Sequence, residues 1–183
     1  MQRSFFILGL ILSNEQSKKK KLPPEQVTTD RILRWGFDHP GITSTNPQLR
    51  LESYKLTIDG EVDNPVTLNW KDFAALPQTT SVSDFHCVEG WSVVDCKWEG
   101  VTLTEIERLV KPRDVARAVT FECADNYTTS LFREELRGND VLLAYKLNDE
   151  DLDEGLGFPY PVAEGFESPN TNRRSIQVIR LDG

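Results

Sequence analysis

The sequence predicts an α+β fold with mostly antiparallel or mixed sheets and short helices. Segments with the pattern of strands outnumber segments with the pattern of helices, and the two do not alternate regularly. Neither a GxGxxG motif nor a P-loop is present. These observations argue against a doubly wound nucleotide-binding fold.

Five segments outside the stretch 81–103 have the pattern of strands. Residues 54–60, YKLTIDG, alternate polar and apolar side chains and end in Asp-Gly, which is typical of a strand and its turn. We expect residues 66–68 to pair with this strand or to extend it. Three apolar segments rich in β-formers predict further strands, at 117–124, 141–147 and 174–181.

Residues 69–77 predict a short helix, with Asn69 as its N-cap and Pro77 as its stop. Its apolar side chains are expected to face the core, namely Trp70, Phe73, Ala74 and Leu76.

Residues 100–112 predict a second helix that closes at Pro112, because Thr102 and Glu105 have capping-box spacing. One apolar stripe supports it, consisting of Leu103, Ile106, Leu109 and Val110. Residues 130–138 predict one or two helical turns.

The 183 residues suffice for a single domain with a sizeable core. A run of lysines at 18–21 and the pair Pro23-Pro24 mark a boundary. We therefore expect an apolar and lysine-rich extension at residues 1–21 and one folded domain at residues 22–183.

The apolar run at residues 5–12 resembles the core of an export signal but is too short to span a bilayer. The lysines follow the run, where positive charge opposes translocation. We expect a cytoplasmic protein. The alternative is export or membrane anchoring through residues 1–21, and we expect membrane contact only through these residues.

The net charge of −8 argues against a nucleic-acid partner, because binding phosphate backbones needs a basic face. An anionic ligand would need a local group of arginines or lysines. The three cysteines are an odd number and lack the paired spacing of a zinc site. They predict free thiols in a reducing compartment.

Residues 81–103 contain two of the three cysteines and one of the two histidines. Cys87 follows an alternating strand and precedes Gly90, which is expected to break it, so Cys87 should lie at a sheet rim. His86 and Cys87 should point to opposite faces of that strand, which argues against a nucleophile and base pair. The residues alone leave open a buried structural thiol or a ligand.

Residues 84–92, DFHCVEGWS, followed by WEGV at 98–101 and a helix, resemble the cofactor-cysteine segment of the sulfite oxidase superfamily of molybdopterin enzymes. The small sulfite-oxidase-like proteins and the methionine sulfoxide reductase catalytic subunits are most similar. Further similar segments occur in the family's order, at residues 22–26, 29–31, 68–77, 124–131, 141–145 and 157–159. The resemblance thus covers about residues 22 to 159.

The resemblance implies the sulfite-oxidase-type fold and a molybdenum–molybdopterin cofactor, with the Cys87 thiolate as the protein's metal ligand. A soft thiolate suits such a metal. The implied reaction is two-electron oxygen-atom transfer on a small sulfur-containing, S-oxide or N-oxide substrate. Electrons would pass to or from a separate partner, a haem or other redox protein, and a monomer is expected.

The resemblance also implies further site residues. Glu89 and Tyr127 are expected near the reacting centre, and His86 and Val88 beside the cofactor. The pterin phosphate is expected to meet arginines from the N-terminal arm and from near the end of the chain, namely Arg31, Arg34, Arg173 and Arg174.

The match has two departures. Sulfite oxidases have Asn-Arg where this chain has Gly90-Trp91, which makes sulfite a doubtful substrate. The family's arginine after its glycine-x-proline segment and its lysine-rich segment near the C-terminus are also missing. Two alternatives therefore stay open: a cofactor-free binding or scaffolding module with this fold, and a redox protein that uses Cys87 with Cys96.

Overall fold

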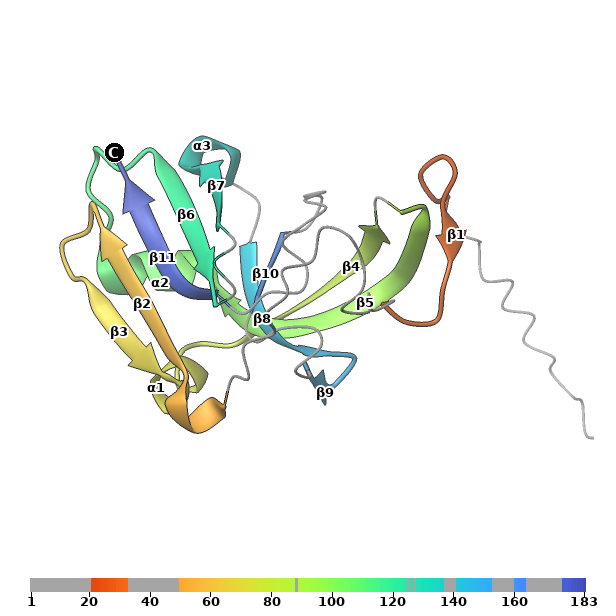
Figure 1. The fold of residues 1–183 in the computed structure, drawn as a ribbon, viewed down its shortest axis with the longest axis horizontal. Helices are drawn as coiled ribbons and strands as arrows, with labels where there is room; N and C mark the ends of the chain where they lie inside the picture. Colours follow the sequence, from red (N-terminus) through yellow and green to blue (C-terminus); the bar gives the residue numbers. More distant parts are fainter. Residues whose placement is uncertain are drawn as a thin grey trace, which may run out of the picture.

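The computed structural model describes residues 21–32, 50–87, 89–124, 126, 128–136, 141–152, 160–163 and 176–183, with the backbone alone at 160–163. Within these ranges the strands form a five-stranded and a six-stranded sheet. Figure 1 shows the five-stranded sheet at one end of the molecule and a long hairpin of the other sheet reaching toward the opposite end.

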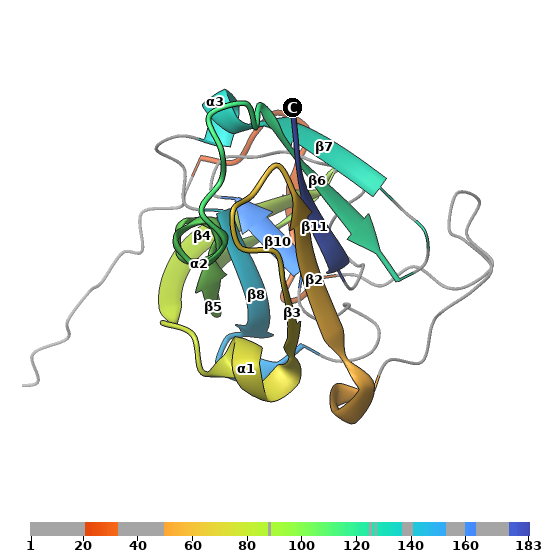
Figure 2. The same ribbon diagram turned by 90° about the vertical axis from the view of Figure 1, so that its left-hand side faces the viewer.

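The five-stranded sheet has the order β3-β2-β11-β6-β7. Figure 2 shows these strands side by side. They are β2 (Lys55–Gly60), β3 (Val66–Asn69), β6 (Ala118–Cys123), β7 (Thr128–Phe132) and β11 (Ile176–Asp182). The central strand β11 runs parallel to β2, and the other pairs are antiparallel.

The six-stranded sheet is built around β5 and β8. Its strands are β1 (Val27–Thr28), β4 (Thr79–Cys87), β5 (Trp91–Thr102), β8 (Val141–Leu147), β9 (Glu150–Asp151) and β10 (Tyr160–Ala163). The short β1 is parallel to β5, whereas every other pair is antiparallel. The predicted α+β class with mostly antiparallel, mixed sheets is therefore confirmed.

The helices are short. They are the 3-10 turn η1 (Leu51–Ser53) and the α-helices α1 (Trp70–Ala74), α2 (Leu103–Val110) and α3 (Arg133–Leu136). In the described ranges, no helix combines the length and the apolar character that crossing a membrane requires.

Helix α1 begins at the predicted N-cap. The side chain of Asn69 accepts a hydrogen bond from the Asp72 backbone, and the Asp72 carboxylate accepts one from the Asn69 backbone. Phe73 is buried, but Ala74 is exposed, so the predicted core position of Ala74 is wrong. One residue further along a helix turns the side chain about 100° away from the core. Trp70 and Leu76 pack against the core while partly buried.

Helix α2 begins later than predicted. Thr102 is its N-cap, and the Thr102 hydroxyl accepts a hydrogen bond from the Glu105 backbone at 3.2 Å. Gly100 to Thr102 belong to β5 instead, because they pair with β8. A Cβ atom on Gly100 would lie only 2.2 Å from the carbonyl oxygen of Leu143. Glycine is therefore required at this position, because the Leu143 backbone leaves no room for a side chain.

The segment predicted to be helical at 130–138 is helical only in part. Ser130, Leu131 and Phe132 are the last residues of β7 and pair with β6. Helix α3 follows at once and occupies residues 133–136, while residues 137–140 lie outside the described ranges. Residues 130–132 form a strand instead of a helix because their backbone groups have partners in β6.

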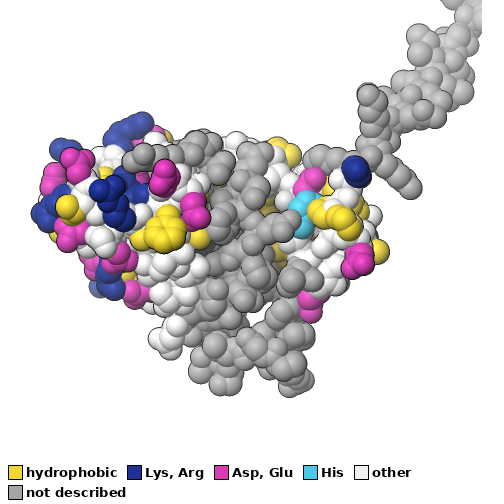
Figure 3. Space-filling model, turned by 90° about the horizontal axis from the view of Figure 1, so that it is seen from above, with side chains coloured by type: hydrophobic (Ala, Val, Ile, Leu, Met, Phe, Trp, Pro, Cys, Tyr) yellow, Lys and Arg dark blue, Asp and Glu magenta, His cyan; other side chains and the backbone are white. Residues whose placement is uncertain are grey.

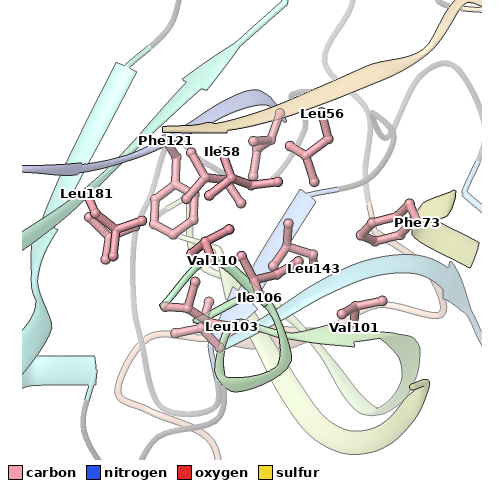
Figure 4. Packing of buried hydrophobic residues seen from close by; sticks show 14 of the residues in the cluster. Leu56, Ile58, Phe73, Val101, Leu103, Ile106, Val110, Phe121, Leu143 and Leu181 are labelled. Carbon is pink, nitrogen blue, oxygen red and sulfur yellow. The ribbon is translucent and has the colours of Figure 1, made fainter. Parts of the chain in front are cut away.

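The main core fills the space between the five-stranded sheet, α2 and the adjacent strands β5 and β8. Figure 4 shows side chains from β2, β6, β11, α2 and β8 meeting there. Its fully buried members include Leu56, Ile58, Ile106, Leu143 and Ile179, each with no exposed area. Three of the four apolar residues predicted for α2 are buried, while Leu109 is partly buried.

A second, smaller group of buried side chains, which we call the hairpin core, lies against the β4–β5 hairpin. It contains Ile32, Cys87, Trp91, Val93, Cys96, Trp98, Leu142, Ala144 and Leu152. Cys96 has no exposed area, and Cys123, in the main core, is 8% exposed. The prediction that these two thiols are core residues is confirmed, and none of the three cysteines forms a disulfide.

One polar cluster joins β5 and β8. The hydroxyl of Tyr145 donates a hydrogen bond to the carboxylate of Glu99 at 2.8 Å, and the Lys146 ammonium lies 3.2 Å from the same oxygen. Burial, and then the bond to Glu99, raises the pKa of Tyr145 to about 12. The hydrogen bonds from Tyr145 and Lys146 lower the pKa of Glu99.

Candidate functional site

The site begins at the turn between β4 and β5. Cys87 ends β4 and Trp91 begins β5 directly opposite it. Gly90 takes a φ of +88°, which favours glycine, and its N–H donates to the carbonyl of Cys87 at 3.0 Å. The predicted break at Gly90 is therefore a tight reversal, and it places Cys87 at the end of a strand.

The Cys87 side chain lies beside a carboxylate and an indole. Its thiol sulfur is 3.9 Å from Oε2 of Glu89, and the indole N–H of Trp91 points to the same oxygen at 3.5 Å. The ring of Phe85 stacks on Trp91 with the centroids 5.6 Å apart. Cys87 is 8% exposed whereas Glu89 is exposed, so the thiol sits just below the surface with a carboxylate above it.

The opposite face of the hairpin carries a hydrogen-bonded group. Nδ1 of His86 lies 2.7 Å from the hydroxyl of Ser92, its partner across the strands. The Ser92 hydroxyl donates to Oε1 of Gln26 at 2.8 Å, and Nε2 of Gln26 donates to the carbonyl of Cys87 at 2.9 Å. The side chains of His86 and Cys87 thus meet different partners, as the strand pattern predicted.

The N-terminal arm, residues 21–32, lies along this turn. The Val27 N–H donates to the carbonyl of Gly90 at 2.9 Å, and the Thr29 N–H donates to that of Ser92 at 2.8 Å. Arg31, an expected phosphate contact, is exposed two residues after Thr29. The arm therefore brings one of the predicted arginines to the same end of the hairpin as Cys87.

The alternative of a redox pair formed by Cys87 and Cys96 is contradicted. Cys96 pairs with Ser83, four positions before Cys87 on β4. At the usual rise along a strand this separates the two cysteines by about 13 Å, and a disulfide requires Cα atoms closer than about 7 Å. The two thiols cannot bond without opening the hairpin.

Five of the predicted site residues lie outside the described ranges, and their roles stay predictions. They are Arg34, Val88, Tyr127, Arg173 and Arg174.

Two residues that the structure brings to the site were not predicted to belong to it, Gln26 and Ser92. Gln26 stands within the segment 22–26 that resembles the family, and Ser92 closes the segment 84–92. Nothing in either segment indicates that their side chains meet, because 66 positions separate them.

Charged side chains of both signs are interspersed at the end of the molecule that holds the five-stranded sheet (Figure 3). Several arginines there pair with carboxylates: Arg180 with Asp59 at 2.9 Å and Arg133 with Glu107 at 2.9 Å. Their charges are thus balanced locally, away from the Cys87 turn.

A family model described as the oxidoreductase molybdopterin binding domain matches residues 43–163, and the chain belongs to this family. Its class is that of the molybdenum-dependent oxidoreductases of the sulfite oxidase type, whose cofactor is molybdenum–molybdopterin.

Among particular proteins, the uncharacterized oxidoreductase YuiH of Bacillus subtilis is 34% identical over 148 residues, covering 80% of this chain and 72% of that protein. The putative protein-methionine-sulfoxide reductase subunit YedZ1 of Azospira oryzae is 33% identical and covers 64% of this chain. The protein-methionine-sulfoxide reductase catalytic subunit MsrP of Campylobacter jejuni is 27% identical and covers 71%.

The sulfane dehydrogenase SoxCD of Paracoccus pantotrophus has a similar fold, with a TM-score of 0.67 at 21% identity over 76% of this chain. The chain spans 46% of YedZ1, 42% of MsrP and 40% of the SoxCD chain.

The donors at the turn fit this cofactor. A pterin that brings its own dithiolene sulfurs requires one soft donor from the protein, and the Cys87 thiol is such a donor. In the described ranges no cluster of three or more His, Cys, Asp or Glu side chains could hold a metal ion. Cys87, at a strand end and just below the surface, is a soft donor of this kind, and its role as the metal ligand stays a prediction.

Proposed function

We propose that this chain catalyses two-electron oxygen-atom transfer on a small sulfur-containing, S-oxide or N-oxide substrate. In the reducing direction an S-oxide takes up two electrons and two protons, its S–O bond breaks, and a thioether and water leave. In the oxidising direction the balance reverses: water supplies the oxygen, and two electrons and two protons are released. The observation that carries the proposal is the position of Cys87 at the rim of β4.

Cys87 would bind the molybdenum as a thiolate. The bound group supplies the two-electron change in oxidation state that oxygen-atom transfer needs. The chain itself fixes the donor, because the carbonyl of Cys87 receives hydrogen bonds from Gly90 and from Gln26. Two donors on one carbonyl limit how far the turn can move when a ligand binds.

Glu89 is the residue that we expect to face the substrate. Its carboxylate lies beside the thiol and is exposed, while the indole N–H of Trp91 points to one of its oxygens. It could accept a hydrogen bond from a substrate or from water next to the metal. Tyr127 is proposed as a second polar group, on the family resemblance alone.

The relatives support the S-oxide direction. YedZ1 and MsrP carry protein-methionine-sulfoxide reductase in their names, and both are named as subunits. We therefore propose that electrons reach this chain from a separate redox protein, with a haem or another one-electron carrier. The expected cytoplasmic location and monomeric state belong to the same proposal; cell fractionation and gel filtration test them.

The decisive experiment is the molybdenum and pterin content of the chain, purified from a host supplied with molybdate and able to make the cofactor. About one molybdenum per chain with a thiolate-to-metal absorption band supports the enzyme. Well-folded protein without molybdenum would instead favour the cofactor-free module.

Cys87→Ser should lose that absorption band and the turnover while the circular dichroism spectrum stays unchanged. Cys96→Ser is the matched control, because Cys96 is a buried thiol of the same hairpin outside the turn. Retained turnover in Cys87→Ser would assign the ligand elsewhere. Reduced-dye oxidation with sulfoxides, set against ferricyanide reduction with sulfite, decides the direction; activity with sulfite alone would refute the S-oxide proposal.

A further inference from the structure

One amide side chain joins the strands β4 and β5 at their turn. Gln26, from the N-terminal arm, reaches the carbonyl of Cys87 with its nitrogen and the hydroxyl of Ser92 with its oxygen, at 2.9 and 2.8 Å. Ser92 has no exposed area, so its hydroxyl depends on protein partners. The contacts join residues 61 and 66 positions apart in the chain.

The chemistry of these groups fixes the direction of every hydrogen bond. A carbonyl oxygen only accepts, so the Gln26 atom facing Cys87 is the NH₂ group and the atom facing Ser92 is the oxygen. The single hydroxyl proton of Ser92 then goes to Gln26. Because that proton is used, Ser92 can only accept from His86, and Nδ1 of His86 must carry a hydrogen.

We propose that Gln26 is a positioning residue for this site. It holds the backbone of Cys87 in place and, through Ser92, selects the His86 tautomer with hydrogen on Nδ1. Nε2 of the neutral ring is then left as a hydrogen-bond acceptor. The role of Cys87 as ligand rests on the function proposed above, whereas the hydrogen-bond chain belongs to the protein alone.

The N-terminal arm thereby has a second task besides completing the sheet. It binds β5 by two backbone hydrogen bonds, which the main chain makes whatever residue stands at position 26. The Gln26 side chain adds the contacts that reach Cys87 and His86. Replacing Gln26 should thus loosen the turn without detaching the arm.

The test uses the full chain, made in a host that cannot synthesise the pterin, so that metal binding does not mask the thiol. Mass spectrometry follows alkylation by iodoacetamide at each cysteine, with Cys96 and Cys123 as internal references. Nitrogen NMR reports which ring nitrogen of neutral His86 carries hydrogen, and His39 serves as the reference.

In Gln26→Leu we expect alkylation of Cys87 to rise about threefold to tenfold, the range that one lost hydrogen bond produces, and His86 to show a mixture of tautomers. Gln26→Glu keeps the accepting oxygen and loses the NH₂ group. It should raise the rate of Cys87 alkylation but preserve the His86 tautomer with hydrogen on Nδ1. Ser92→Ala should do the reverse: His86 should show a mixture of tautomers, while the rate of Cys87 alkylation stays within about twofold of the original.

An unchanged Cys87 rate and an unchanged His86 tautomer in Gln26→Leu would overturn the proposal. So would an equal rise at Cys96 and Cys123, because Gln26 would then support the whole fold. If Gln26→Leu does not fold, the opposite responses of Gln26→Glu and Ser92→Ala decide. None of these measurements needs molybdenum, so a protein that lacks the cofactor would fail the functional proposal and leave this one standing.

Discussion

Replacing Tyr145 by phenylalanine removes one hydrogen bond from the β5–β8 junction and little else. The side chain is 8% exposed and its hydroxyl donates to Glu99 at 2.8 Å. The ring itself meets the edge of Trp70 at a centroid distance of 5.3 Å, and phenylalanine can keep that contact. The effect of Tyr145→Phe therefore measures the bond to Glu99.

The magnitude follows from the partners that remain. A hydrogen bond to a charged group contributes about 1.5–3 kcal/mol. Glu99 keeps the Lys146 ammonium at 3.2 Å and some contact with water, so the lower end applies. A loss of about 1.5 kcal/mol corresponds to a fall of about 3–6 °C in Tm for a chain of this size. Urea unfolding and calorimetry at pH 7 measure both quantities.

The pH dependence gives the sign of the effect. The pKa of Tyr145 is raised from 10.0 to about 12, first by burial and then by the bond to Glu99. A group whose pKa is raised in the folded state stabilises the protein fully below its unfolded pKa and loses that contribution as pH rises toward the folded value. The difference between the original protein and Tyr145→Phe should be constant between neutral pH and pH 10 and shrink from pH 10 to 12; it should also shrink in acid, where Glu99 is protonated.

A double-mutant cycle with Glu99→Gln separates this bond from general packing effects. We expect a coupling free energy of about 1 kcal/mol between positions 145 and 99. Purely additive effects, or a stability difference that stays constant up to pH 12, would refute the reasoning.

Two further substitutions test the packing. Gly100→Ala should prevent folding or lower the Tm by more than 10 °C, on the order of several kcal/mol, because the new Cβ would meet the Leu143 carbonyl at 2.2 Å. Gly183→Ala is the control: its new Cβ would have no atom nearer than 3.6 Å, so the Tm should change little. Equal effects of the two substitutions would contradict the close approach at Gly100. Phe73→Ala should lower the free energy of unfolding, measured with urea, by about 3–5 kcal/mol, because Phe73 has no exposed area. Phe132 is 64% exposed, so Phe132→Ala should change it by no more than about 0.5 kcal/mol. A small effect of Phe73→Ala would show that neighbouring core side chains fill the cavity.

The elements that could be predicted from sequence are those whose own residues decide their conformation. Strand β8 occupies residues 141–147 as predicted, because its first five side chains are apolar and all are buried. Asn69 caps α1 as predicted, since a cap depends on side chains only three positions apart.

The errors fall where a distant strand decides. Gly100 and Val101 were predicted to open the helix that follows, yet they belong to β5 because β8 supplies their strand partners, while the predicted cap at Thr102 is confirmed. Residues 130–132 likewise join β6 across the sheet. Propensity within a short window cannot register partners that lie tens of residues away.

The candidate site divides in the same way. Cys87 could be predicted because a contiguous segment carries the family resemblance, and Glu89 and His86 lie within two residues of it. Gln26 and Ser92 reach the same turn only after the N-terminal arm has paired with β5. Their role is a product of tertiary structure.

The position of β11 has a consequence for folding. It lies between β2 and β6, so it joins the β2–β3 hairpin, formed early in the chain, to the β6–β7 hairpin. Until residues 176–182 emerge from the ribosome, both hairpins present an open edge to the solution. The pairing of β11 with β2 closes a loop of more than 100 residues, a contact that forms slowly. The five-stranded sheet therefore cannot be completed before residues 176–182 are available to pair.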